Sequence, residues 1–161
     1  MNGQKDIEYM KIALNEAQKA ACLSEVPVGA VVVRDGEIIA SAHNLRETDR
    51  SATAHAELLA IESACRALGG WRLSGCTLYV TLEPCPMCAG AIVNSRIDRV
   101  VYGASDSAAG CLGSVINFNS YPFNHAFEVE GGVLEEECSA ILREFFENKR
   151  SKKREQIKNE A

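Results

Sequence analysis

Apolar residues recur along the chain with two different periods, and these periods predict an α/β protein. Spacings of three and four predict a helix over residues 7–24. A nearly unbroken apolar run over residues 28–33, with four valines, is typical of a strand that is covered on both faces. Asp35-Gly36 is typical of a two-residue hairpin turn with positive φ, so we expect residues 37–43 to return as a second strand.

The middle of the chain predicts two more helices. Thr53 is a suitable cap for a helix that runs to about Leu68, where Gly69-Gly70 would end it. A second helix is expected from Pro86, which suits a first turn, to Val93, and its apolar circumference places it in the core. Strands are expected on either side of this helix, over residues 77–82 and 99–102.

The last third of the chain predicts a loop, a short strand and a final helix. Residues 103–124 are rich in small residues and have weak periodicity, so we expect either a long functional loop or a loop with a short helix. A strand is expected over residues 128–133 and a helix from Glu135 to about Lys149. The whole order of elements predicts one mixed sheet with helices on both faces. We expect a single domain over residues 1–150, followed by a basic C-terminal tail over 151–161.

Composition narrows the class of protein only slightly. The length of 161 residues suits one domain, and the apolar and charged fractions of 47% and 24% are ordinary for globular proteins. No apolar run approaches the roughly 20 residues that span a membrane, and residues 1–6 do not resemble a signal peptide. The seven cysteines, an odd number, therefore favour a reducing compartment. We expect a cytoplasmic protein that does not enter a membrane.

The charge distribution leaves two interpretations open. The net charge of −5 argues weakly against a nucleic-acid partner. A basic run lies near the C-terminus, however, and comprises Lys149, Arg150, Lys152, Lys153 and Arg154. It is either a solvated helix end or a patch that contacts phosphate groups.

Two short motifs carry candidate metal chemistry. One is Glu83-Pro-Cys-Pro-Met-Cys88 and the other is His55-Ala-Glu57. Two thiolates and one imidazole are good zinc ligands, and a position at a helix N-terminus favours the thiolate form of cysteine. His55 and Glu57 are two residues apart and do not share a helix face, so both serve one site only if the metal lies beyond the helix end. We therefore expect the two motifs to meet at helix N-termini, at one edge of the sheet.

The number of ligands favours catalysis over structure. Structural zinc sites usually have four protein ligands, whereas catalytic sites have three and leave one position for water. His55, Cys85 and Cys88 make three. Cys76 and Cys111 remain possible fourth thiolates, although neither has a paired spacing. The pattern predicts an open site in which zinc lowers the pKa of a bound water to roughly 7 and Glu57 shuttles the proton.

Each motif also has a plain alternative. The C-x-x-C pair is also typical of a redox dithiol, but a dithiol explains neither His55 nor Glu57. His55 alone is consistent with a core histidine, and Glu57 with a structurally paired carboxylate. The apolar neighbours of Glu57 favour proton transfer, because buried glutamates without a partner are rare. The other cysteines are most simply core residues: Cys22, Cys65, Cys76, Cys111 and Cys138.

The paired motifs resemble a known enzyme superfamily. His55-x-Glu57 followed by Pro84-Cys85-x-x-Cys88 is similar to the signature of the zinc nucleobase deaminases. Longer blocks between about residues 7 and 150 resemble the bacterial tRNA adenosine deaminases. They include Glu25-Val-Pro-Val-Gly-Ala30, Ala42-His-Asn44, Thr53-Ala-His-Ala-Glu57, Leu78 to Ala91, Arg99-Val-Val-Tyr-Gly-Ala104 and Asn124-His125.

The resemblance implies a fold, a reaction and partners. The fold would be a cytidine-deaminase-like three-layer α/β/α sandwich around a five-stranded mixed sheet. The reaction would convert adenosine to inosine at the wobble position of an arginine tRNA anticodon, in a homodimer. His55, Cys85 and Cys88 would bind one zinc ion per chain, and Glu57 would move the proton from the zinc-activated water. The target base would be flipped out of its stack into the pocket.

The resemblance also assigns substrate contacts. Asn44 would hydrogen-bond the flipped nucleoside and Val28 would line the pocket, while Asn124, His125 and Phe146 would lie near the anticodon loop. Each residue has a structural alternative, as a loop, core or surface residue. The chain departs from the family at Ser51-Ala52, where Asp-Pro is frequent, and at Ala126, where a basic or polar residue is frequent. The second departure puts one RNA contact in doubt.

Two rival functions remain open at this point. The first is the same chemistry on a small molecule, such as free guanine, cytosine or a cytidine nucleotide. A small-molecule enzyme does not need the basic segment, so removal of the residues after Arg150 would leave its activity unchanged. The second rival is a zinc-stabilised binding module without turnover, in which Glu57→Ala would be silent.

Overall fold

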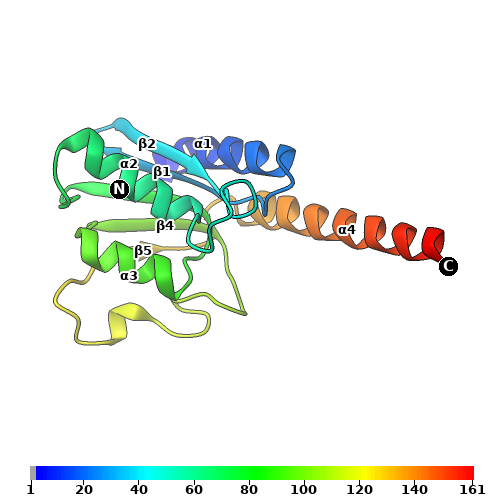
Figure 1. The fold of residues 1–161 in the computed structure, drawn as a ribbon. Helices are drawn as coiled ribbons and strands as arrows, with labels where there is room; N and C mark the ends of the chain where they lie inside the picture. Colours follow the sequence, from blue (N-terminus) through cyan, green and yellow to red (C-terminus); the bar gives the residue numbers. More distant parts are fainter. Residues whose placement is uncertain (1–2) are drawn as a thin grey trace.

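The computed structural model describes residues 3–161 and has three layers (Figure 1). Helices α1 (Gly3–Cys22) and α4 (Glu135–Glu160) cover one face of a central sheet, and helices α2 (Ala56–Leu68) and α3 (Pro86–Ser95) cover the other. The three-layer α/β/α arrangement is therefore confirmed. Met1 and Asn2, which the expected domain over residues 1–150 includes, lie outside the described residues.

The sheet has the strand order β2-β1-β3-β4-β5 within residues 3–161. β1 pairs antiparallel with β2 and β3, whereas β3, β4 and β5 are parallel to one another, so the prediction of a mixed five-stranded sheet is confirmed. The strands are β1 (Gly29–Arg34), β2 (Glu37–His43), β3 (Cys76–Leu82), β4 (Arg99–Ala104) and β5 (Glu128–Glu130).

Strand β1 explains why its apolar run is unbroken. Successive side chains of a strand point to opposite faces of the sheet. Ala30 and Val32 belong to the core under α2 and α3, whereas Val31 and Val33 belong to the core under α1 and α4. Because both faces are covered by helices, the positions from Ala30 to Val33 are all apolar and buried, as predicted, and only Arg34 at the end of the strand is exposed.

Two of the predicted connections between elements are present in the structure. Asp35 and Gly36 have φ values of 51° and 77°, so the hairpin turn has the two positive φ angles that the dipeptide predicts. The loop that was expected over residues 103–124 begins after Ala104, where β4 ends, and holds one short 3-10 helix, Phe118–Ser120. Strand β5 is shorter than predicted and ends at Glu130, just before Gly131-Gly132.

The predicted start of α2 was wrong. Thr53 does not cap this helix, because the N-cap residue is His55, whose side chain makes no capping hydrogen bond. The backbone N–H of Ala56 instead donates to Oδ1 of Asn44, at 2.8 Å, from the end of β2. Asn44, twelve residues before Ala56, therefore caps the helix in place of a neighbouring side chain. The His55 side chain is not needed for capping and is available for another role.

The predicted end of α4 was also too early. We expected the helix to stop at about Lys149, but it continues to Glu160 and projects beyond the three layers (Figure 1). The basic run therefore lies on a helix. No helix within residues 3–161 is both long enough and apolar enough to cross a membrane.

A buried ion pair ties α1 to the sheet at the end where the parallel strands begin. Both carboxylate oxygens of Asp6 accept hydrogen bonds from the Arg99 guanidinium at 2.9 Å, and Asp6 Oδ1 also accepts from the Tyr79 hydroxyl at 2.8 Å. Hydrogen bonding by Arg99, with a smaller contribution from Tyr79, outweighs burial and holds the pKa of Asp6 below its ordinary value.

Asp6→Asn should lower the free energy of unfolding at pH 7 by about 3 kcal/mol, because it breaks this buried pair. A lowered folded-state pKa stabilises the fold above the ordinary pKa of 3.8, and this contribution disappears as the pH falls through the folded-state value. Urea unfolding at pH 7 and pH 3 should therefore show a difference between variant and wild type that shrinks in acid.

Glu128→Gln is the matched control. Its side chain is 80% exposed and its carboxylate lies 4.0 Å from Arg99 Nε, so we expect a change below about 1 kcal/mol. Equal losses in the two variants would contradict the assignment of stability to the buried Asp6–Arg99 pair.

Candidate active site

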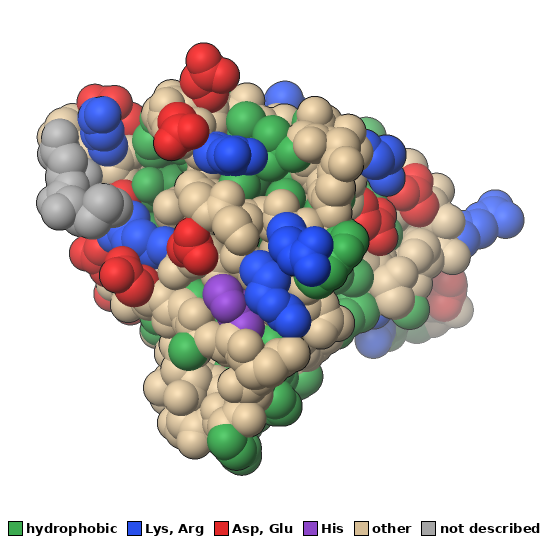
Figure 2. Space-filling view, turned by 90° about the vertical axis from the view of Figure 1, so that its left-hand side faces the viewer, with side chains coloured by type: hydrophobic (Ala, Val, Ile, Leu, Met, Phe, Trp, Pro, Cys, Tyr) green, Lys and Arg blue, Asp and Glu red, His purple; other side chains and the backbone are tan. Residues whose placement is uncertain are grey.

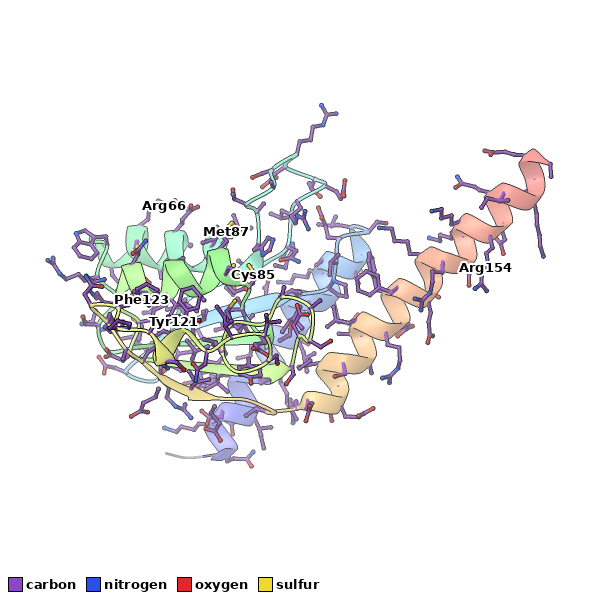
Figure 3. The ribbon with its side chains drawn as sticks, turned by 90° about the horizontal axis from the view of Figure 1, so that it is seen from below. Arg66, Cys85, Met87, Tyr121, Phe123 and Arg154 are labelled. Carbon is purple, nitrogen blue, oxygen red and sulfur yellow. The ribbon has the colours of Figure 1, made fainter. Side chains whose placement is uncertain are left out.

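The two sequence motifs meet where two helices begin. His55 is the N-cap residue of α2, and Cys85 is the N-cap residue of α3, with Pro86 in its first turn. The two helices lie side by side in one layer, and Figure 3 shows Cys85 at the start of α3 with Met87 close by. Strand β3 ends at Leu82, three residues before Cys85, so Cys85 lies at the carboxyl end of this strand. The ligand-bearing edge is the carboxyl end of the parallel strands, where α/β proteins commonly bind ligands.

The candidate metal ligands stand at distances that suit zinc. His55 Nδ1 lies 3.7 Å from Cys85 Sγ and 3.6 Å from Cys88 Sγ, and the three ligand atoms are all within 4.8 Å of one another. Tetrahedral zinc with ordinary Zn–N and Zn–S bonds separates a nitrogen and a sulfur ligand by about 3.6 Å. The donor set and its spacing therefore fit a zinc ion.

The protonation of these groups is tightly linked. Hydrogen bonding with Cys88 lowers the pKa of Cys85 to about 4, against the effect of burial and with further help from His55. The same bond with Cys85, together with burial, raises the pKa of Cys88. The bond with Cys85 also raises the pKa of His55, although burial opposes it. A metal ion would replace these shared protons, since zinc binds thiolates and neutral imidazole.

No fourth cysteine completes this group within residues 3–161. Cys76 begins β3, at the opposite end of the strand from Cys85. Cys111 is buried, and its thiol donates to the carbonyl of Ala109 at 3.4 Å. Three protein ligands are typical of a catalytic zinc site with one position for water.

Glu57 lies in the first turn of α2, beside the candidate ligands. Its side chain is only 4% exposed, yet it lines a cavity of about 540 Å³ together with His55 and Cys85. Burial raises the pKa of Glu57 above its ordinary value. Its place beside the candidate ligands lets this carboxyl group accept a proton from a bound water and pass it on.

The cavity is assembled from several separate segments of the chain. Its size is within the usual range for small-molecule sites. Val28 and Asn44 come from the β1 and β2 region, and Leu142 and Phe146 come from α4. The structure thus brings Val28, Asn44 and Phe146, three of the predicted substrate contacts, to the same cavity as the candidate ligands.

Asn44 has a structural role and still reaches the cavity. Its Oδ1 atom accepts the hydrogen bond from Ala56 that starts α2, and its backbone N–H donates to the Val28 carbonyl at 3.2 Å. Because Oδ1 is engaged, the Nδ2 amide group is the end that Asn44 offers to a ligand.

Asn124 and His125 lie elsewhere. Neither is among the residues that line the cavity. His125 Nε2 donates to the Ile97 carbonyl at 2.7 Å, and its ring stacks on Phe127. A role for this pair in RNA contact stays a prediction.

Sequence reasoning assigned no site role to Arg46 or to residues 105–109 in the loops that flank the cavity. Arg46 lines it from the loop after β2, and Ser105–Ala109 line it from the loop after β4. Each loop is held by a buried glutamate: Glu25 accepts hydrogen bonds from Glu47 and Thr48, and Glu83 accepts from residues of the second loop. Glutamates in apolar, proline-containing segments were the available signal, because buried glutamates need partners.

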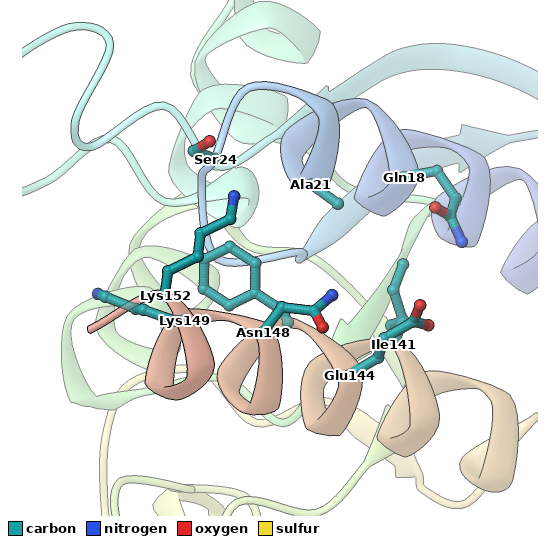
Figure 4. A pocket seen from close by; sticks show the side chains of 9 residues that line it. Gln18, Ala21, Ser24, Ile141, Glu144, Asn148, Lys149 and Lys152 are labelled. Carbon is teal, nitrogen blue, oxygen red and sulfur yellow. The ribbon is translucent and has the colours of Figure 1, made fainter. Parts of the chain in front are cut away.

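A second hollow is separate from this site. It measures about 300 Å³ and lies between the end of α1 and α4 (Figure 4). Gln18, Asn148, Lys149 and Lys152 are among its lining residues, and none of the candidate ligands is. Its two basic side chains, Lys149 and Lys152, come from the outer part of α4 itself.

The chain is similar to known deaminases in both sequence and structure. Residues 3–104 match the family described as the cytidine and deoxycytidylate deaminase zinc-binding region. The chain is 58% identical, over 156 residues, to a tRNA-specific adenosine deaminase of Bacillus subtilis, and the match covers 96% of this chain and 97% of that protein.

Two solved structures are informative neighbours. One, from a study of A-to-I editing by tRNA:A34 deaminases at the wobble position, is 48% identical with a TM-score of 0.82, and the match covers 84% of this chain and 99% of that one. The other, a guanine deaminase of Bacillus subtilis, is 42% identical with a TM-score of 0.59, and the match covers 65% of this chain and 66% of that one.

Proposed function

The chain belongs to the cytidine and deoxycytidylate deaminase family, within its tRNA-specific adenosine deaminases, and we propose that it converts adenosine to inosine at the wobble position of a tRNA anticodon. One observation supports the proposal of a zinc-dependent deamination. His55, Cys85 and Cys88 form a three-ligand group beside a buried Glu57, and His55, Cys85 and Glu57 all line one cavity. The similarity to tRNA-specific adenosine deaminases over nearly the whole chain supports tRNA adenosine as the substrate.

The reaction replaces the amino group at C6 of adenine by oxygen, consumes one water and releases ammonia. One zinc ion, bound by His55, Cys85 and Cys88, would supply an acidified water as the nucleophile. Glu57 would take a proton from this water and deliver it to N1 of the adenine, and a proton would then leave with the ammonia. Its buried position at the cavity, beside the three ligands, suits both steps, because the same group must first accept and then donate the proton.

The cavity wall would hold the flipped nucleoside. Val28, which is buried, presents an apolar surface to the base, and the Asn44 amide is placed to donate a hydrogen bond. Phe146 is 40% exposed at the cavity and offers a ring against which a neighbouring base can stack. A nucleotide in an anticodon loop is already unpaired, so flipping it requires little energy.

The surface charge suggests where the rest of the RNA would lie. On the face shown in Figure 2, acidic and basic side chains are intermixed. The basic run of residues 149–154 lies instead on the outer part of α4, after Phe146 in the chain, and Figure 3 shows Arg154 on this part of the helix, well away from Cys85. We propose that this helix contacts phosphate groups. An arginine tRNA, a homodimer and a cytoplasmic location belong to the same proposal, as does a single catalytic domain over residues 1–150.

The test uses an RNA hairpin that copies an arginine tRNA anticodon stem-loop with adenosine at the wobble position. Incubation with the purified protein should give inosine, which mass spectrometry detects as a change in nucleoside mass. Free adenine, adenosine, guanine, cytosine and cytidine are assayed in parallel and should remain unchanged.

Two other results would revise the proposal. Deamination of free guanine alone would keep the zinc chemistry but move the substrate to that of the structural neighbour from Bacillus subtilis. Zinc binding without turnover of any substrate would favour a binding module.

A further inference from the structure

One buried carboxylate beside the site has no part in the proposed chemistry. Glu83 is 2% exposed and lies between the end of β3 and Cys85. Its carboxylate accepts hydrogen bonds from the backbone N–H groups of Asp106, Leu112 and Ser114 at 3.2, 3.0 and 3.1 Å, and from the Ser114 hydroxyl. A carboxylate has about four acceptor positions, so the loop over residues 105–114 uses all of them.

The segment that these bonds enclose is a wall of the catalytic cavity. Ser105 to Ala109 line the cavity, and Glu83 holds the loop within this stretch, at Asp106, and again beyond it, at Leu112 and Ser114. Within the segment, Asp106 Oδ1 accepts from the N–H groups of Ala108 and Ala109 at 3.0 and 3.2 Å. The wall therefore has a defined shape, and its attachment point is Glu83.

The loop is also packed directly on the carboxylate. A Cβ atom at Gly110 would collide with the Glu83 carboxyl group, so only glycine lets the backbone approach this closely. The N–H of Cys111 donates to the Pro84 carbonyl at 2.9 Å, one residue before Cys85. The cavity wall and the ligand-bearing segment thus form one hydrogen-bonded unit.

We propose that Glu83 is a positioning residue for the deamination, which acts by holding residues 105–114 as a wall of the substrate cavity. This inference rests on the proposed function for its kinetic consequence, although the loop geometry itself does not depend on it. A loosened wall would bind the flipped nucleoside less well, whereas the zinc ligands and Glu57 would keep their places on α2 and α3.

Glu83→Gln tests the proposal, because glutamine has the same shape but turns an NH₂ group toward backbone N–H donors. We expect the KM for the RNA hairpin to rise about 10- to 100-fold, which is the value of one or two hydrogen bonds to a charged group. The kcat should change much less, and zinc should remain at one per chain. Hydrogen–deuterium exchange should accelerate within residues 106–114 and not in α2 or α3.

Two further variants separate positioning from general stability. Ser114→Ala removes one of the four hydrogen bonds to Glu83 and should raise KM in the same direction by a smaller factor, which keeps the proposal testable if Glu83→Gln folds poorly. Asp6→Asn removes a buried carboxylate at the other end of the sheet and should lower stability without changing KM or exchange in the loop.

Three outcomes would overturn the proposal: an unchanged KM with unchanged loop exchange in Glu83→Gln, loss of zinc from that variant, or an equal rise in KM in Asp6→Asn. Failure of the proposed function is distinguishable, because the wild-type protein would then give no inosine. Loop exchange in the variants would still report whether Glu83 holds the wall.

Discussion

Glu57→Ala is expected to retain zinc and to bind the RNA hairpin while losing nearly all turnover. Positioned acid–base groups contribute about 10²- to 10⁴-fold to rates, and the proposed reaction uses this carboxylate for each proton transfer. Glu57 is buried at the cavity beside the ligand group, and alanine leaves no other carboxylate of α2 at this place. Single-turnover assays of inosine formation, with zinc content and hairpin affinity measured on the same samples, test the expectation.

Glu62→Ala is the matched control for this variant. Glu62 lies on the same helix, but its side chain is exposed and does not line the cavity. Its replacement should leave turnover at the wild-type level. Normal activity in Glu57→Ala would rule out the proton-transfer role and would favour a binding module, whereas loss of zinc from that variant would mean that Glu57 supports the metal instead.

Cys88→Ala should abolish both zinc binding and turnover. Cys88 is fully buried, and its sulfur lies 3.6 Å from His55 Nδ1, so its removal leaves two of the three ligand atoms. Because the proposed zinc ion would supply the acidified water, we expect turnover to fall on the order of a thousandfold or more. Zinc per chain, measured by atomic absorption, should fall well below one. Chelation of zinc from the wild type should give the same inactivity, and added zinc should restore it.

Cys138→Ala provides the control for loss of a buried thiol. Cys138 is also fully buried, but it lies in the core under α1 and α4 on the opposite face of the sheet. This variant should keep one zinc per chain and most of its turnover, although some stability will be lost with the buried sulfur. Retention of zinc and activity in Cys88→Ala would exclude the proposed ligand set.

Local patterns in the sequence determined most of the architecture and the candidate ligand set. The valines of β1 alternate between two cores, and Asp35-Gly36 has the positive φ angles of its turn, because both properties depend only on adjacent residues. The C-x-x-C spacing across the first turn of α3 likewise predicts that Cys85 and Cys88 face one point.

Tertiary structure alone decided how the ends of elements and the cavity wall are held. The start of α2 is satisfied by Asn44 and not by Thr53, and the loop after β4 is fixed by Glu83. These bonds join residues twelve or more positions apart, whose partners no local period reveals. Phe146 likewise meets cavity residues from distant parts of the chain, such as Val28 and Asn44, while His125 Nε2 donates instead to the carbonyl of Ile97. Hydrogen-bond partners of buried polar groups are set by which segments the sheet brings together, and only the folded chain shows that choice.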